Sequence, residues 1–219
     1  MASLREIDAS KIDFGAKDGK FARTTIEGAL PKFMLGSMDA PLRAPFGIST
    51  PYTGDESEPR RTMDLEITDP DDLAQLAAID EAVVQAGVKN SVPWFGRMLN
   101  EAAVRAMHTP LVIAPKKEEY APTVRTKVDV VKTVIYVPKG KIAKRVTKDD
   151  VVKGSQVAAK VTLSSVMFGN RQFNVSLSVE KLMVKPSADA SGASEFGDFV
   201  VEEDEPPAKR TKSEEEGFF

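Results

Sequence analysis

The chain has 219 residues, of which 42% are hydrophobic and 29% charged, and it contains no cysteine, one histidine and a formal net charge of -3. The hydrophobic share is sufficient for the core of one ordinary domain with appendages. Disulfide frameworks and thiolate metal sites are excluded, so an intracellular reducing compartment is expected. No stretch approaches the ~20 apolar residues of a membrane span, and MASLREIDAS lacks the apolar run of a signal peptide, so we expect a soluble protein with no membrane partner.

The charge is divided unevenly along the chain. Residues 189–219 carry ten Asp or Glu against Lys209, Arg210 and Lys212, a local charge of -7, whereas the preceding residues carry +4. Residues 116–153 alone hold eleven Lys or Arg against five Asp or Glu. An asymmetry of this kind indicates a body that binds polyanions and an acidic appendage.

Short β-type patterns open the chain. Residues 20–26 alternate weakly between polar and apolar side chains, and residues 30–35 follow as a second run. Residues 41–52 contain three prolines, which confine them to an edge strand or a shaped loop. The polar segment 53–61 is expected to be a turn or a mobile loop.

Two helices are predicted in the middle of the chain. Asp69 is a good N-cap, Pro70 suits the first helical position, and an apolar stripe leads to Gly87, a plausible C-terminal cap. A second helix is predicted from Trp94 to Met107. Because both helices interrupt a β-rich chain, we expect a helical insertion at about residues 69–108, packed on the end of a barrel.

Residues 123–137 predict one long strand, since valines occupy one parity and Arg125 and Lys127 the other. Its second half is apolar on both faces, which is typical of a covered strand. Residues 138–141 are expected to form a basic turn, and residues 144–153 a short basic connection.

The clearest pattern covers residues 157–185, which predict two long antiparallel strands. One parity of the first strand is apolar, with Met167 among the inward positions, and Phe173 begins the inward parity of the second. Gly169-Asn170 lies where a two-residue turn needs positive φ. The alternation slips at Glu180-Lys181, which predicts a β-bulge and a bent hairpin.

These elements favour a mainly β fold, an OB-fold-like Greek-key barrel with a helical insertion, over a sandwich. We expect residues 1–186 to form this domain. Residues 187–219 are small, polar and acidic, so they cannot bury enough apolar surface to offset the entropy of ordering. A disordered acidic C-terminal tail is therefore predicted.

Nucleic-acid binding needs cations that neutralise phosphates and exposed aromatics on which bases stack. The candidate cations are Arg125, Lys127, Lys132, Lys139, Lys141, Lys144, Arg145, Lys160 and Arg171. The candidate stacking residues are Phe46, Tyr52, Trp94, Phe95, Tyr120, Tyr136, Phe168 and Phe173. Phe168 has the stronger case because it breaks the polar parity of its strand beside Arg171, whereas Phe173 lies on the core parity. Aromatics that only pack in the core are the alternative at each position.

The tail carries two further motifs. It ends with Glu214, Glu215, Glu216, Gly217, Phe218 and Phe219, so two aromatics follow an acidic run. We expect this end to dock partner proteins while its carboxylates imitate a phosphate backbone; a purely solubilising tail is the alternative. Lys209, Arg210 and Lys212 have the form of a monopartite nuclear-import signal.

The sequence offers little support for an enzyme. It contains no P-loop, dinucleotide-binding glycine motif, nucleophile elbow or carboxylate cluster at metal-ligand spacing. His108 lies near the expected end of the second helix, without partners for catalysis. We expect no catalytic residue, no metal site and no cofactor.

Four stretches carry a family resemblance: PLRAPFGIS at 41–49, VPWFG at 92–96, VTLSSVMFGNRQFNVSLSVEKLMVKP at 161–186, and the acidic tail ending in phenylalanine. They resemble phage T7-type single-stranded DNA-binding proteins and their relatives in large nucleocytoplasmic DNA viruses and some eukaryotes. The resemblance covers nearly the whole chain. It implies a single OB fold that coats unwound DNA, and a tail that binds replication proteins and competes with DNA. The terminal aromatic of the family matches Phe219, while the doubled Phe218 and the import-like motif indicate a viral or eukaryotic branch.

We therefore expect a largely sequence-independent single-stranded DNA-binding protein of replication, recombination or repair, whose tail docks proteins such as a polymerase or helicase. Its expected location is the nucleus or a viral replication compartment. A structural or virion scaffold protein and an RNA-binding module remain as alternatives. A homodimer also stays open.

Overall fold

The computed structural model describes residues 2–51, 53–139 and 142–186, with the side chains of Lys139 and Ile142 excepted. The predicted tail, its import-like motif and its terminal phenylalanines lie outside the described residues.

A ring of five strands forms the centre of the fold, each paired with the next: β4 (Leu42–Ala44), β10 (Ser155–Gly169), β11 (Gln172–Val184), β7 (Thr123–Asp129) and β5 (Arg60–Glu66). The ring closes just after β4, where Ile48 bridges Met63 and the Ser49 N–H donates to the Thr62 carbonyl at 2.8 Å. β11 and β7 run parallel, and the other described pairs of the ring run antiparallel. The predicted mainly β, OB-fold-like barrel is confirmed.

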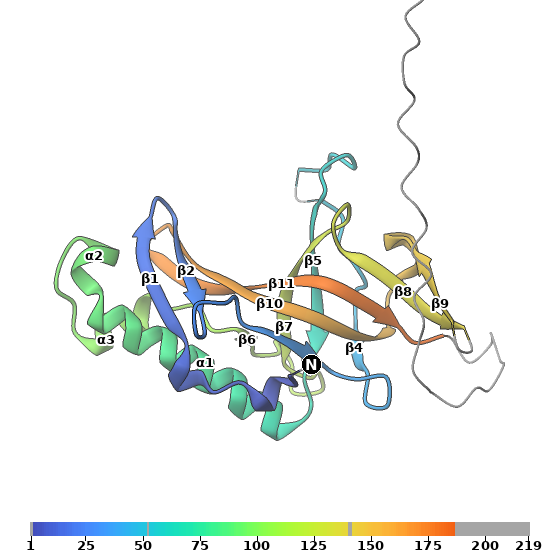
Figure 1. Ribbon diagram of the computed structural model, residues 1–219, viewed down its shortest axis with the longest axis horizontal. Coiled ribbons are helices and arrows are strands. Elements are labelled where there is room, and N and C mark those ends of the chain that lie inside the picture. The colour runs from blue at the N-terminus through green and yellow to red at the C-terminus, as the bar shows by residue number, and fades with distance from the viewer. Residues whose placement is uncertain (1, 52, 140–141, 187–219) are drawn as a thin grey trace, which may run out of the picture.

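The remaining described strands extend this sheet: β1 (Asp13–Asp18), β2 (Phe21–Thr25), β3 (Lys32–Leu35), β6 (Val112–Ile113), β8 (Val134–Lys139) and β9 (Ile142–Val146). β2 pairs with the tip half of β10 and with β1, and β3 pairs with β10 beside β4. β8 pairs with β11 and carries β9 on its other edge. In Figure 1 the long β10–β11 hairpin therefore has β1–β2 towards one end and β8–β9 towards the other.

The predicted hairpin is confirmed, but its turn lies one residue further along. Gly169 pairs with Gln172, so the two turn residues are Asn170 and Arg171, with φ of 43° and 65°. Glu180 is the unpaired bulge residue, as the slip in the pattern predicts. A second bulge at Ser164 shifts the parity of β10, so Val166 is buried in place of Met167.

The first predicted helix begins as expected and runs further than expected. α1 spans Pro70–Lys89, and the Asp69 side chain accepts a hydrogen bond from the Asp71 N–H. Gly87, expected to be the C-terminal cap, lies inside the helix. Its lack of a side chain allows close packing, since a Cβ there would be 2.7 Å from Val104 Cγ1. Short 3-10 helices lie at Leu4–Glu6, Ala9–Lys11 and Lys148–Asp150.

The second predicted helix is two helices, α2 (Ser91–Phe95) and α3 (Glu101–Met107). Gly96, at φ 75°, ends α2 in the left-handed conformation, and the Asn100 side chain caps α3. No helix in the described part of the chain is long and apolar enough to cross a membrane.

The single strand predicted over residues 123–137 is also interrupted. The Asp129 side chain accepts hydrogen bonds from the Val131 and Lys132 N–H groups, which turns the chain between β7 and β8. Residues 142–146, expected to belong partly to a connection, form strand β9. The basic residues of this region therefore lie on a hairpin.

The helices cover one side of the tip half of the β10–β11 hairpin (Figure 1). Leu76, Ile79 and Val83 on α1 are fully buried, and Gly87 packs against Phe173 of β11. Phe168 and Phe173 face this helical layer, because both rings contact Trp94 of α2. The helices thus form a layer along one side of the hairpin, where packing on a barrel end was predicted. Within residues 2–51, 53–139 and 142–186, α1, α2 and α3 all lie on this side.

Candidate nucleic-acid interface

We use the term sheet face for the outward side chains on the side away from α1, contributed by Phe21, Arg23, Arg60, Thr62, Arg125, Lys127, Met167 and Ser178. Paired residues on neighbouring strands project to the same side of a sheet. Phe21 pairs with Met167, and Lys127 pairs with both Thr62 and Ser178. Lys127 Nζ also lies 2.6 Å from Met167 Sδ, which joins the β7 end of this face to the tip half of β10.

Three of the four cations of the sheet face have no paired acid in the described part of the chain. Arg23, Arg60 and Lys127 are exposed, and none has an acidic partner within the described part of the chain. Residues 155–179 contain no Asp or Glu at all. Although Lys127 is exposed as a residue, partial burial of its ammonium group lowers its pKa, and the nearby charge of Arg60 lowers it further. Two neighbouring cations are stabilised when an anion binds.

Apolar surface lies beside these cations. Phe21 is 49% exposed and is paired with Met167, so a flat ring and a flexible thioether are adjacent on the same face. Exposed aromatic rings stack on nucleic-acid bases of any sequence. The combination of cations and an exposed ring is the chemistry expected of a surface for unpaired polynucleotide.

Sequence reasoning missed Phe21, Arg23 and Arg60, although a signal was present for each. Phe21 and Arg23 alternate with the buried Ala22 and Thr24, so an aromatic lies on the solvent parity of β2. Arg60 lies on the parity opposite the buried Met63 and Leu65 of β5. An aromatic or a cation on the solvent parity of a short strand is the pattern that identifies them.

Two predicted cations are already neutralised by carboxylates. Arg125 forms a bidentate pair with Asp64, with Nε–Oδ1 at 2.8 Å and Nη2–Oδ2 at 2.9 Å. Lys160 lies 3.1 Å from Glu180, which also pairs with Lys32 at 2.6 Å. Burial alone would raise the pKa of Glu180, but hydrogen bonds from Lys32, Thr162 and Lys160 lower it to about 2. Both cations are therefore less available to phosphates than Lys127.

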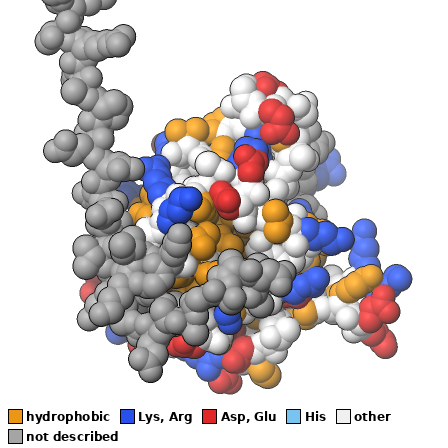
Figure 2. All heavy atoms as spheres, turned by 90° about the vertical axis from the view of Figure 1, so that its right-hand side faces the viewer, with side chains coloured by type: hydrophobic (Ala, Val, Ile, Leu, Met, Phe, Trp, Pro, Cys, Tyr) orange, Lys and Arg blue, Asp and Glu red, His pale blue; other side chains and the backbone are white. Residues whose placement is uncertain are grey.

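A second group of predicted residues lies on the β8–β9 hairpin. Tyr136 pairs with Arg145 across the two strands, and Lys144 is exposed. Lys132 lies in the preceding turn, with 84% of its side chain exposed. The side chains of Lys139 and Lys141 lie outside the described residues. On the end of the molecule that carries β8 and β9, Lys and Arg side chains lie on both sides of a central hydrophobic area (Figure 2).

A third group meets at the hairpin tip, on the helical side of the sheet. Trp94 is only 1% exposed and has edge-to-face contacts with Phe14, Phe95 and Phe168, so the expected exposed ring is not found there. Phe168 is half-buried, and Arg171 is exposed in the turn. Phe168 and Trp94 line a cleft together with Arg171.

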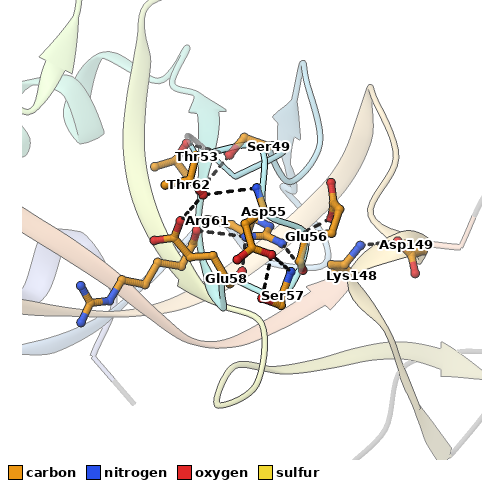
Figure 3. A network of polar contacts seen from close by, with 11 residues as sticks. Ser49, Thr53, Asp55, Glu56, Ser57, Glu58, Arg61, Thr62, Lys148 and Asp149 are labelled. Carbon is orange, nitrogen blue, oxygen red and sulfur yellow. Dashed lines mark hydrogen bonds and ion pairs between the residues drawn. The ribbon is translucent and has the colours of Figure 1, made fainter.

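The loop before β5 is organised by Arg61, whose side chain is 1% exposed (Figure 3). Its guanidinium donates to the carbonyls of Glu56 and Glu58, with 2.9 Å to the Glu56 oxygen. Hydrogen bonds from Ser57 lower the pKa of Asp55 in the same turn. The expected turn or mobile loop is thus folded around a buried cation, and it directly precedes Arg60 of the sheet face.

The position of the sheet face agrees with the fold. Oligonucleotides bind OB folds on the face of the second and third barrel strands and on the loops that join strands one and two and strands four and five. In this barrel those parts are β5 and β7, the loop at residues 45–59 and the turn at 170–171. This is an argument from fold-level analogy, and the side chains named above supply the chemistry. The described residues contain no group of three or more His, Asp or Glu suited to a metal ion.

No protein-family model matches the chain, and no curated protein matches it significantly. Among solved structures, the C-terminally truncated single-stranded DNA-binding protein of bacteriophage Enc34 is similar, with a TM-score of 0.47 and 11% identity over 82% of this chain and 98% of that chain. The same phage protein in complex with single-stranded DNA gives a TM-score of 0.44 and 10% identity, over 85% of this chain and 99% of that chain. The single-stranded DNA-binding protein encoded by bacteriophage T7 gives a TM-score of 0.46 and 17% identity, over 75% of this chain and 91% of that chain.

Proposed function

We propose that this protein binds single-stranded DNA on the sheet face, largely without regard to sequence. The observation that carries the proposal is the set of three exposed cations, Arg23, Arg60 and Lys127, that have no acidic partner among the described residues and lie beside the exposed Phe21. The tip half of the β10–β11 hairpin and β2 add no acid to this surface. A polyanion is therefore attracted to this part of the face, whereas Asp64 and Asp129 lie on the β5–β7 part, opposite Arg125 and Arg60.

The binding mode follows from the side chains. Phosphates contact the three cations, and bases contact the ring of Phe21 and the thioether of Met167. Stacking contributes about 1 to 3 kcal/mol per base, and it tolerates any base because every base has a π face. Phosphate contacts carry no sequence information either. A protein with these properties protects unwound DNA in replication, recombination or repair.

The tail would add regulation to this surface. Residues 189–219 carry a net charge of -7 and compete with DNA for the cations of the sheet face. Phe218 and Phe219, after Glu214, Glu215 and Glu216, dock replication proteins such as a polymerase or a helicase. Lys209, Arg210 and Lys212 direct the chain to the nucleus or a viral replication compartment.

The salt dependence of binding tests the interface. With labelled oligo-dT, each phosphate contact contributes about -0.7 to the slope of log K against log salt. The triple substitution of Arg23, Arg60 and Lys127 to alanine is expected to make the slope shallower by about two, since three contacts are lost. Lys11→Ala, on a 3-10 helix that packs on α1, is the matched control and leaves the slope unchanged. An unchanged slope in the triple variant rejects the sheet face as the interface.

Two further comparisons separate the alternatives. A scaffold protein shows no salt-dependent binding to oligo-dT, and an RNA-binding module prefers oligo-rU over oligo-dT of the same length. Removal of residues 189–219 tests the tail: we expect tighter binding of oligo-dT than by the full chain. Weaker or equal binding after truncation contradicts competition by the tail.

A further inference from the structure

A cleft of about 730 Å³ opens at the tip of the β10–β11 hairpin, on the side opposite the sheet face. Its volume is within the usual range of small-molecule sites. It is lined by residues from β1, α2, the α2–α3 connection, α3 and the hairpin tip: Lys17, Trp94, Phe95, Arg97, Met107, Phe168, Gly169, Asn170, Arg171 and Gln172. These residues include three cations and no acid, so the cleft favours an anion.

The apolar wall of the cleft is aromatic. The Phe168 ring lies 5.2 Å from Trp94 and 5.9 Å from Phe95, measured between ring centroids. Lys17 Nζ donates to the Trp94 carbonyl at 2.8 Å and lies 4.8 Å from the centroid of Phe168. A cation is thus fixed against the aromatic wall, which suits a ligand that combines a flat ring with a negative charge.

The arginine at the turn occupies a conformation that disfavours it. Arg171 has φ of 65°, the left-handed region that glycine adopts without strain and that long side chains adopt rarely. The two-residue turn requires positive φ at both Asn170 and Arg171, so the turn accounts for this strain, and what bears on the cleft is the position of the Arg171 side chain. Here the strained residue places a guanidinium on the cleft, facing neither Asp nor Glu in the lining.

We propose that this cleft binds one nucleotide unit of the DNA strand, with its base against Phe95, Met107 and Phe168 and its phosphate at Arg97 and Arg171. The inference rests on the proposed function and extends it. Met167 of the sheet face and Arg171 of the cleft lie four residues apart across the hairpin tip. A strand that crosses the sheet face therefore continues around the tip and ends its contacts in the cleft, which anchors it.

The emission of Trp94 reports on this cleft, because it is the only tryptophan of the chain and it lines the site. Titration of the full chain with thymidine 5′-monophosphate is expected to quench or shift this emission. Thymidine and inorganic phosphate are each expected to bind at least about ten-fold more weakly, since each lacks one of the two recognised groups. Equal affinity of phosphate alone contradicts a nucleotide site.

Two variants test the cations of the cleft. Arg171→Gly removes the guanidinium and relieves the positive φ, so we expect unchanged or higher thermal stability together with about ten-fold weaker binding of the nucleotide. Arg97→Glu is expected to abolish nucleotide binding, whereas Lys11→Glu, on the 3-10 helix that packs on α1 and outside the cleft lining, leaves it unchanged. Wild-type affinity in both cleft variants overturns the proposal.

The failure of this proposal is distinguishable from the failure of the proposed function. If oligo-dT still binds with a steep salt slope while the nucleotide leaves Trp94 emission unchanged, the sheet face stands and the cleft proposal falls. If a peptide of residues 214–219 binds the cleft and the nucleotide does not displace it, the cleft is a protein-docking site and the proposal also falls. Absence of any binding to oligo-dT contradicts both the proposed function and the cleft proposal.

Discussion

Asp64→Asn offers a test in which a substitution is expected to improve binding. Asp64 accepts two hydrogen bonds of 2.8 and 2.9 Å from Arg125 Nε and Nη2. This pairing raises the pKa of Arg125 and occupies the two nitrogens that could otherwise bind a phosphate. The carboxylate is 14% exposed and the arginine 58% exposed, so the cation lies at the solvent edge of the sheet face. Removal of the negative charge makes Arg125 available to a phosphate.

The expected magnitude follows from counterion release. One additional phosphate contact steepens the salt slope for single-stranded DNA by about 0.7. If the variant and the wild type bind equally at 1 M salt, the association constant of the variant is then about five-fold higher than that of the wild type at 0.1 M. The loss of an exposed ion pair costs about 1 kcal/mol of stability or less. Fluorescence anisotropy with labelled oligo-dT at several salt concentrations measures both the slope and the affinity.

Asp72→Asn is the matched control. Asp72 also binds an arginine, with Arg5 Nε at 2.8 Å, but it lies at the start of α1, away from the sheet face. We expect no change of slope in this variant. If Asp64→Asn leaves the slope unchanged or makes it shallower while Asp72→Asn behaves as wild type, Arg125 does not face the DNA and the assignment of the sheet face is wrong.

Three further predictions concern stability. Gly87→Val brings a side chain to within 2.7 Å of Val104 Cγ1, so we expect a loss of about 1 to 3 kcal/mol in urea denaturation; an unchanged midpoint contradicts the packing of α1 on α3. Arg61→Met leaves buried carbonyls of the loop without their donor and is expected to cost about 2 to 4 kcal/mol, with an unaltered salt slope for DNA; a shallower slope means that Arg61 reaches phosphate. Glu180 has a pKa of about 2, below the ~4.3 of an unfolded chain, so its stabilising effect is complete above that value and is lost as pH falls towards 2. Glu180→Gln should therefore weaken the pH dependence of the melting temperature between pH 5 and 2, and an identical pH profile refutes this ion-pair cluster.

The long hairpin and the start of α1 were predictable because their signals are local. Alternation determines the strand parity of residues 157–163 and 173–179, up to the bulges at Ser164 and Glu180, and Asp69-Pro70 specifies a helix start by capping chemistry alone. The turn was misplaced by one residue because Gly169 is the better turn former, while the register of the pairing places Asn170 and Arg171 there. The strand predicted over residues 123–137 ends at Asp129, because the Asp129 side chain accepts hydrogen bonds from the Val131 and Lys132 N–H groups. The alternation of valines gives no signal of this turn.

The candidate site was predictable only in part, because it depends on contacts between distant strands. Lys127 was identified from its strand parity, but its association with Arg60, Phe21 and Met167 comes from the order of β2, β10, β11, β7 and β5 in the sheet. Trp94 was named among the candidate stacking rings, which need to be exposed. Its burial results from Phe14 and Phe168, which are brought to it from two other parts of the chain.

Photocrosslinking is the most direct test of the sheet face. An oligo-dT that contains 5-iodouracil, irradiated in complex with the full chain and analysed by mass spectrometry, is expected to crosslink to Phe21 and Met167, the exposed ring and the neighbouring thioether. Crosslinks confined to the β8–β9 hairpin, at Tyr136, would contradict the account and move the DNA to that end of the molecule.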